Sequence, residues 1–379
     1  MKSEQIIRFF QSSLDWIRFQ GEQFFQYFET LPGLEVALQV LILTVVFIFV
    51  FTLIIALGVV LLRIKNNWNS RRFHRLEKSW EGQIMEFLSA DGVDGLQPIL
   101  VKRRDRQFFV QYLYRFAARL RGQELLIIKE LAKPYLDMVA EKLTKGYPEL
   151  RARNVNILAT LGFPEYIDPI IQSLEDGAPI VKMAAARILA HADYPEHIDL
   201  ILPHLASFDE WSMNFLASML SEMGAEVAPR LRQELLHSQG SLRVRIASAE
   251  ALRRIGDLAA ADAAVAVLQT EPDYELSAAC LKILRELGTP RHRHMLVNLV
   301  NSENEIVRLH ALAALGSIGS EADAHILEDA LNDGSSWVVL QAARAMKKVL
   351  TQAQLKDLAQ SGHAGAVVAQ QVLAEGGQA

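Results

Sequence analysis

Residues 163–174 read FPEYIDPIIQSL, and a near copy, YPEHIDLILPHL, follows at residues 194–205. Around these two segments, the apolar helical stretches of the chain end at equivalent positions. Successive end positions are 31, 31, 32, 32, 31 and 31 residues apart. Self-similarity at a fixed period of this size indicates stacked structural repeats. We therefore predict seven units over residues 148–350, which close at Gly162, Asp193, Gly224, Gly256, Gly288, Gly319 and Leu350.

Each unit holds two helical patterns joined by a short polar turn, such as Glu175-Asp176-Gly177. A single helix pair cannot bury its apolar faces alone, and stacking on the next pair supplies the burial. Small residues recur in the second helix of a unit, where neighbouring helices should pack closely; in residues 307–319 they are Ala311, Ala314 and Gly316. The predicted fold class is all-α, an α-solenoid of helix pairs.

Residues 307–319, VRLHALAALGSIG, resemble the second helix of the HEAT family. The likeness is greater to the short variant of phycobilisome-lyase-type repeats, which reads roughly VRxxAAxALGxIG. The resemblance implies a HEAT-like solenoid in which the basic residue of this motif bonds turn acids along the stack, a ladder formed here by Arg151, Lys182, Arg245 and Arg308. The ladder should be interrupted at Met213, Ser277 and Val339, which replace the basic residue in the other units.

The segments that flank the repeats differ from them. Residues 95–147 are helical in pattern but irregular, and we interpret them as an N-terminal helical cap. Residues 351–379 are interpreted as a C-terminal cap that ends in a small polar tail. Caps are expected where the outer face of a terminal repeat meets solvent.

A long apolar segment precedes the array. Val36 to Leu62 are 27 residues without a charge. At 1.5 Å per residue such a helix is about 40 Å long, more than the roughly 30 Å of a bilayer's hydrocarbon core. We predict one transmembrane helix within residues 34–63. A buried core helix rarely sustains such a run, and a secretory signal is expected to have a shorter apolar stretch nearer the N-terminus.

Basic residues crowd the C-terminal side of this segment. Six lie between Arg63 and Lys78 against one acid, Glu77, which predicts a basic juxtamembrane helix and linker at residues 64–94. Lysine and arginine are retained on the cytoplasmic side. The array is therefore expected in the cytoplasm of a bacterial cell, with the N-terminus outside the inner (plasma) membrane. The membrane-interface residues on this side are Arg63, Lys65, Trp68, Arg71 and Arg72.

Residues 1–33 read as an amphipathic helix rich in aromatic residues, with Phe10, Trp16, Phe24 and Phe28 at the membrane interface. Two interpretations stay open. The helix can rest on lipid, as amphipathic helices do. It can also dock, together with the transmembrane helix, onto a multi-span membrane protein.

Charge is segregated within the chain, whose net charge is −5. The array is acidic, yet the positions of its second helices that should be most exposed are rich in lysine and arginine. We predict a basic concave groove that binds an acidic cytoplasmic protein. The alternative is that these side chains only solvate the helix faces. The predicted partner-binding residues of the groove are Arg187, Arg253, Arg254, Lys282, Arg285, Arg344 and Lys347. If Arg253, Arg285 and Arg344 are all paired with acids inside the fold, the groove prediction fails.

The chain shows no signature of an enzyme. Walker, GxGxxG, GxSxG and HExxH motifs are absent, and one cysteine, Cys280, allows neither an internal disulfide nor a cysteine zinc site. His292 and His294 should point to different faces of a helix, which disfavours joint metal binding. Iron-dependent deoxyhypusine hydroxylases, which resemble HEAT proteins, carry His-Glu dipeptides that this chain lacks. We expect no cofactor and no nucleic-acid substrate.

These features predict a membrane-anchored scaffold or adaptor that presents a protein-binding solenoid and contacts membrane lipid. The finer hypothesis is an accessory or regulatory subunit of a larger inner-membrane complex, such as a glycosyltransferase or secretion machine. One alternative is a lyase-like or cofactor-handling HEAT-like enzyme. Another is a peripheral module that senses anionic lipid through its basic juxtamembrane residues.

Overall fold

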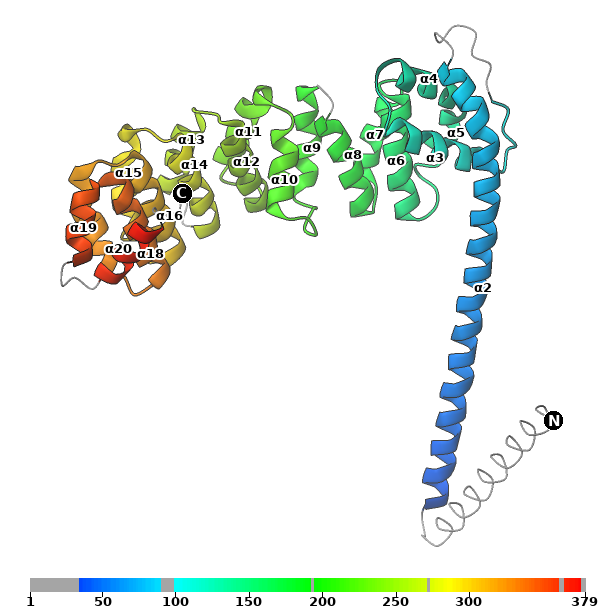
Figure 1. Cartoon of the computed structure of the whole chain (residues 1–379), viewed down its shortest axis with the longest axis horizontal. Coiled ribbons are helices and arrows are strands. Elements are labelled where there is room, and N and C mark those ends of the chain that lie inside the picture. Colours follow the sequence, from blue (N-terminus) through cyan, green and yellow to red (C-terminus); the bar gives the residue numbers. More distant parts are fainter. Residues whose placement is uncertain (1–33, 90–98, 192–193, 271–272, 361–364, 376–379) are drawn as a thin grey trace. The chain divides into compact units, whose positions relative to one another are not determined.

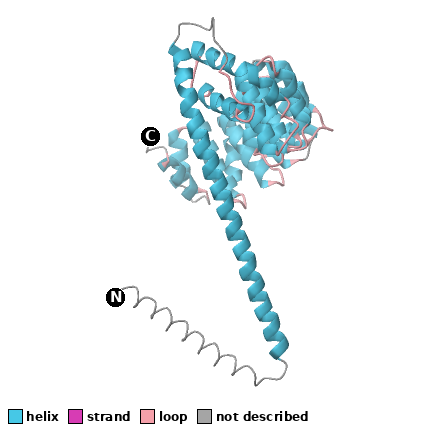
Figure 2. Ribbon diagram, turned by 90° about the vertical axis from the view of Figure 1, so that its right-hand side faces the viewer, coloured by secondary structure: helices cyan, strands magenta, loops and turns pink. Residues whose placement is uncertain are grey.

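The computed structural model describes residues 34–89, 99–191, 194–270, 273–360 and 365–375 (Figure 1). The chain divides into two compact units, Met1–Ser89 and Ala90–Ala379. Every regular element within the described ranges is a helix, as Figure 2 shows. The predictions made for Phe10, Trp16, Phe24 and Phe28 fall outside the described residues.

The first unit contains α2 (Leu34–Ser89), a helix of 56 residues. It continues without a break through the predicted boundary between residues 63 and 64, so the apolar segment and the basic segment share one helix. Its stretch Val40–Leu61 is long and apolar enough to cross a membrane, and none of it is buried. The hydroxyls of Thr44 and Thr52 each donate to a carbonyl four residues earlier, at 2.7 Å.

The second unit begins with short helices that cover the end of the stack. They are α3 (Arg106–Ala117), α4 (Gly122–Ala132), the 3₁₀ helix η1 (Lys133–Tyr135) and α5 (Leu136–Ala140). The α-helices α3, α4 and α5 all contact α6 (Pro148–Gly162). Phe109 is fully buried here and meets the ring of Tyr135 edge-on, with 5.5 Å between centroids. Helices α3 and η1 thus pack together through these two rings.

Helix pairs follow in regular order (Figure 1). The first helices are α7 (Ile167–Gln172), α9 (Ile198–Leu205), α11 (Ala228–Leu236), α13 (Ala260–Thr270), α15 (Arg293–Leu299), α17 (Ala324–Asp329) and α19 (Gln352–Gln360). The second helices are α6, α8 (Pro179–His191), α10 (Met213–Ser221), α12 (Leu242–Ile255), α14 (Tyr274–Leu287), α16 (Glu305–Ile318), α18 (Ser336–Val349) and α20 (Ala366–Ala374). Six further 3₁₀ turns flank first helices: η2 (Ser173–Glu175), η3 (Pro195–His197), η4 (Ala225–Val227), η5 (Pro290–His292), η6 (Glu321–Asp323) and η7 (Ala330–Asn332).

Consecutive second helices contact one another from α6 to α20 and form a single layer, which we name the second-helix row. The local sequence explains where these helices begin and end. The side chains of Ser212, Asp273 and Asn304 cap the starts of α10, α14 and α16 by accepting backbone N–H bonds. Gly256 ends α12 in the left-handed region, at φ 79°, which glycine adopts without steric cost.

The structure confirms the predicted all-α solenoid of helix pairs. It also shows that the predicted C-terminal cap continues the repeat pattern, because α20 packs against both α19 and α18. Alanine and leucine dominate the buried side chains of the row, and small residues allow the helices to approach closely.

Candidate functional site

Arginines on the second-helix row bond acids in the turns between helices. Arg151 donates from Nε and Nη2 to the two carboxylate oxygens of Asp176, both at 2.8 Å. Arg308 makes the same pair of bonds to Asp333, at 2.7 and 2.9 Å. In each case 25 residues separate the partners, so the bond joins one repeat to the turn of the next. These bonds lower the pKa of both carboxyl groups below the ordinary value.

The contacts described for the other two predicted ladder residues are as follows. Arg245 is buried, and its Nε donates to the carbonyl oxygen of Leu235 at 3.0 Å. Lys182 is half-buried on α8, and its positive charge helps to lower the pKa of Asp176, an effect smaller than that of the Arg151 hydrogen bond. Among the described residues, the bonds of Arg151 to Asp176 and of Arg308 to Asp333 follow the pattern expected of the ladder.

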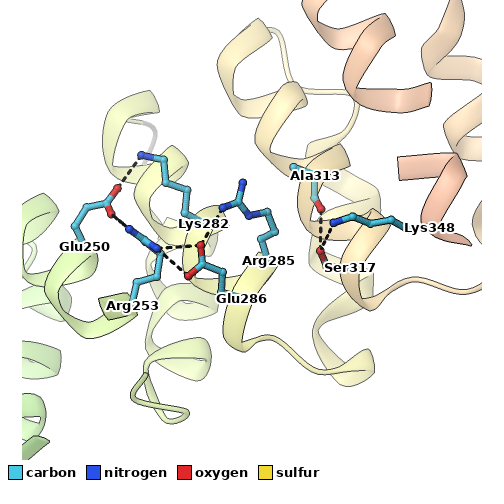
Figure 3. Close-up of polar contacts among 8 residues, drawn as sticks. All are labelled: Glu250, Arg253, Lys282, Arg285, Glu286, Ala313, Ser317 and Lys348. Atoms are coloured by element: carbon cyan, nitrogen blue, oxygen red, sulfur yellow. Dashed lines mark hydrogen bonds and ion pairs between the residues drawn. The ribbon is translucent and has the colours of Figure 1, made fainter. Parts of the chain in front are cut away.

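A network of alternating charges lies on α12 and α14 (Figure 3). Glu250 accepts bonds from Lys282 Nζ at 2.7 Å and from Arg253 Nε at 3.0 Å. Arg253 Nη1 donates to both carboxylate oxygens of Glu286, at 2.9 and 2.8 Å, and Arg285 Nη2 donates to the same group at 2.9 Å. Two carboxylates thus bind three basic side chains across the boundary between two repeats.

Burial and charge act in opposite directions within this network. Glu250 is only 6% exposed, and burial alone would raise the pKa of its carboxyl group. Hydrogen bonds and the charges of Lys282 and Arg253 outweigh burial, so the pKa of Glu250 is lowered. On the adjacent α16, burial and then the charges of Lys282 and Arg285 lower the pKa of His310 to about 4. His310 is therefore neutral at physiological pH.

The remaining basic residues of the predicted groove also have partners, with one exception. Arg344 bonds the carboxylate of Glu375, Arg254 bonds the side chain of Asn214, and Lys347 bonds the carbonyl oxygen of Val372. Arg187 makes no hydrogen bond or ion pair with any residue that the structure describes.

The prediction of an unpaired basic groove is wrong for the residues chosen to test it. Arg253, Arg285 and Arg344 are each bonded to a carboxylate. Arg285 bonds Glu286, the next residue on its own helix, whereas the reason for Arg253 and Arg344 is the stacking of helices. Adjacent second helices place residues about one repeat apart side by side, so Arg253 meets Glu286, 33 positions later, and Arg344 meets Glu375, 31 positions later. The spacing of Arg344 and Glu375 equals one repeat period and was therefore visible in the sequence, whereas the spacing of Arg253 and Glu286 exceeds the period by one or two residues.

The unpaired Arg187 lies in a cleft of about 740 Å³. The cleft lies among α3, α6, α8 and α10, where the N-terminal cap meets the first repeats. Its aromatic walls are Tyr114, Phe163 and Tyr194, and the last two rings lie 5.8 Å apart. The sequence patterns did not indicate these three residues as part of a site. Phe163 and Tyr194 stand at equivalent positions of the two near-identical segments, which is a signal that could have identified them.

His191 and Glu222 complete the polar side of the cleft. His191 Nδ1 lies 3.7 Å from the Glu222 carboxylate, and both side chains are largely exposed. The cleft thus combines an unpaired guanidinium, aromatic rings and a neighbouring carboxylate. A guanidinium can bind a carboxylate through two parallel hydrogen bonds, and aromatic rings supply apolar contact area.

Groups that could carry chemistry are engaged elsewhere in the fold. No cluster of three or more potential metal ligands occurs among the described residues. Cys280 is fully buried, which raises the pKa of its thiol to about 12. His292 Nδ1 accepts the backbone N–H of Thr289, and Nε2 lies 3.0 Å from Asp262. His294 contacts the carbonyl of Arg291 instead, so the two histidines serve separate contacts.

The predicted interfacial residues that follow the apolar segment lie on α2. Arg63 is exposed and Arg72 is half-buried. The helix also contains Lys65, Trp68 and Arg71, whose side chains lie outside what the structure describes.

A family model described as HEAT repeats matches residues 136–213 and 261–347. No curated protein matches the chain. The karyopherin Kap121p, bound to the extreme C-terminus of the protein phosphatase Cdc14p, is 14% identical with a TM-score of 0.38; the match covers 73% of this chain and 42% of the karyopherin.

Two further solved structures are similar. Human deoxyhypusine hydroxylase in complex with glycerol is 18% identical with a TM-score of 0.26, and the match covers 64% of this chain and 97% of that one. An engineered protein is 18% identical with a TM-score of 0.32, with 77% of each chain covered. Both ranges that match the HEAT-repeat model, residues 136–213 and 261–347, fold into stacked helix pairs.

Proposed function

We propose that the chain is a membrane-tethered scaffold whose HEAT array binds an acidic segment of a partner protein in the Arg187 cleft. The observation that carries this proposal is the state of Arg187. It is exposed and unpaired among the described residues, whereas the other predicted groove residues all have partners within the fold. An unpaired guanidinium keeps its hydrogen-bonding capacity for a ligand.

The chemistry of the cleft favours a peptide as its ligand. Arginine and tyrosine are enriched among the residues that carry most binding energy at protein interfaces. Arg187 would bond an Asp or Glu side chain bidentately. Tyr114, Phe163 and Tyr194 would cover the apolar atoms beside it. The volume of about 740 Å³ lies within the range of pockets that hold a small ligand or a few side chains.

The exposed apolar stretch of α2 supports the membrane tether. A core helix of a soluble protein would be mostly buried, and none of Val40–Leu61 is. The two hydroxyls in this stretch bond their own helix, which leaves no unsatisfied side-chain donor toward lipid. The excess of lysine and arginine after residue 62 favours a cytoplasmic array. The finer proposal is an accessory subunit of a larger inner-membrane machine, such as a glycosyltransferase or secretion complex.

Photo-crosslinking in native membranes tests the cleft. Tyr194 of the full chain is replaced by p-benzoylphenylalanine, and the crosslinked peptides are identified by mass spectrometry. We expect one dominant adduct with a segment rich in Asp and Glu, and we expect Arg187→Glu to abolish it. The control position is Tyr147, an exposed aromatic residue outside the cleft, which should not capture this segment. An adduct that survives Arg187→Glu unchanged would overturn the proposal.

A further inference from the structure

Six apolar residues recur at one position of the repeat. Each lies 18 residues after the residue that closes the preceding repeat, at the start of a second helix or in the turn just before it. The set, which we name the apolar edge, is Ile180, Trp211, Leu242, Tyr274, Ile306 and Trp337.

These side chains are not needed for the core. Apart from the half-buried Trp211, which packs on Phe208 with ring centroids 5.7 Å apart, they are between 38% and 68% exposed. In each of the other five helices, an apolar residue one or two positions later is buried instead. These buried residues are Val181, Val244, Leu276, Val307 and Val338. The interior is thus filled by the next residues, and the apolar edge remains available to solvent.

The members of the apolar edge recur in register along the array. They occupy equivalent positions in consecutive repeats, and α8, α10, α12, α14, α16 and α18 contact one another in that order. Packed helices lie about 8–10 Å apart, so six positions span roughly 50 Å. Exposed apolar side chains that align in this way favour an interaction site.

The charges beside the apolar edge are acidic. Glu210, Glu275, Glu303 and Glu305 are exposed in the same turns and first turns of helices. The carboxylates of Glu210, Glu303 and Glu305 make no hydrogen bond or ion pair within the described part of the chain.

The basic side chains nearby are mostly engaged inside the fold. Arg243 bonds the carbonyls of Phe208 and Trp211, and Arg308 bonds Asp333. Lys182, half-buried on α8, adds one positive charge near the first member of the apolar edge. Negative charge thus predominates, which would repel an anionic lipid surface and attract a basic segment.

We propose that the apolar edge binds a basic amphipathic helix of a partner protein. Two turns of an α-helix rise about 11 Å, close to the spacing of neighbouring repeats. A helix with apolar residues seven positions apart could therefore offer one side chain to each repeat, while its lysines face the exposed glutamates. This site is distinct from the Arg187 cleft and takes a ligand of the opposite charge.

A defined peptide tests the apolar edge. The full chain is placed in phosphatidylcholine nanodiscs and titrated against a fluorescent helical peptide of leucine and lysine with heptad-spaced leucines. Binding is followed by anisotropy after subtraction of the signal from empty nanodiscs. We expect Ile306→Ser/Trp337→Ser to weaken binding at least about tenfold, since it removes two of the six apolar contacts. The matched control is Leu258→Ser, which alters an apolar side chain that is 72% exposed elsewhere, and it should bind as the unaltered chain does.

Charge gives a second test that does not depend on packing. Glu303→Lys/Glu305→Lys should weaken binding of the leucine–lysine peptide and strengthen binding of its leucine–glutamate counterpart. Equal binding of both peptides to the unaltered chain, or no effect of either double substitution, would overturn the proposal. The proposal would also be overturned if the chain bound phosphatidylglycerol vesicles and Ile306→Ser/Trp337→Ser removed that binding. Arg187→Glu should leave this binding unchanged, so the apolar edge and the cleft can fail independently.

Discussion

Gly316 on α16 lies directly against Ala345 on α18. A Cβ atom on Gly316 would lie 2.7 Å from both the Cα and the Cβ of Ala345, closer than real Cβ contacts occur. The obstacle includes backbone, which cannot move aside as the end of a flexible side chain can. The small residues that recur in second helices are therefore a condition for the spacing of the row.

Enlarging Gly316 should separate these two helices. We expect Gly316→Val to destabilise the C-terminal repeats by about 1–3 kcal/mol, the usual cost of overpacking. Hydrogen exchange should then be faster in α16 and α18 than in α6 and α8. Gly334→Ala is the control, because no atom lies within 4 Å of the added Cβ. Unchanged protection of α16 in Gly316→Val would show that the row accommodates larger residues.

The buried and exposed ion pairs should differ in their contribution to stability. Arg308 and Asp333 are mostly buried and share two hydrogen bonds, so Arg308→Ala should cost about 1–3 kcal/mol in local unfolding free energy. Arg344 and Glu375 are more exposed, and Arg344→Ala should cost at most about 1 kcal/mol. Hydrogen exchange of α18 measures both. Equal costs would contradict the role assigned to burial.

His310 should make the array sensitive to acid. Its pKa is lowered to about 4 in the folded chain, against about 6.5 when unfolded. Between these values the unfolded state binds a proton that the folded state does not, so stability falls as the pH is lowered from about 6.5 to 4. Between pH 4 and 6.5, the melting temperature of His310→Gln should therefore depend less on pH than that of the unaltered chain. Above pH 7, the two melting temperatures should depend equally on pH. If the melting temperatures of the two proteins change equally with pH around pH 5, this role of His310 is refuted.

Periodicity made most of the repeat architecture predictable. Gly162 ends α6, and Gly256, Gly288, Gly319 and Leu350 are the residues at which later second helices terminate, as the spacing indicates. This works because each repeat must present the same surface to its neighbour. The irregular cap has no period, so nothing in the sequence indicated that Tyr114 would join Phe163 and Tyr194 in one cleft.

The charge of the predicted groove could not be derived by counting exposed positions. Counting treats each residue as isolated, whereas stacking brings Arg253 beside Glu286 and Lys282 beside Glu250. One carboxylate then compensates two basic side chains. Arg187 differs because its counterpart one repeat later, Ser218, has no charge to offer.

The proposed transmembrane segment should not tolerate charge at its centre. Val50 lies near the middle of Val40–Leu61, and arginine at such a position costs about 2.5–3.5 kcal/mol on insertion scales. The double variant Phe49→Arg/Val50→Arg should shift the chain from the membrane pellet to the carbonate-soluble fraction. Ile64 lies beyond the apolar stretch, so the Ile64→Arg variant should remain in the membrane pellet. Release of Ile64→Arg as well would argue against a span at these residues.

A charge swap tests whether Arg187 holds an acidic segment of a partner protein. Once crosslinking from position 194 has identified the segment, its Asp or Glu is replaced by lysine and association is measured by co-purification from membranes. We expect Arg187→Glu alone to abolish association, Arg153→Glu on the exposed surface of α6 to preserve it, and the lysine-bearing partner to restore it to Arg187→Glu. Undiminished association of Arg187→Glu with the unaltered partner would contradict the claim.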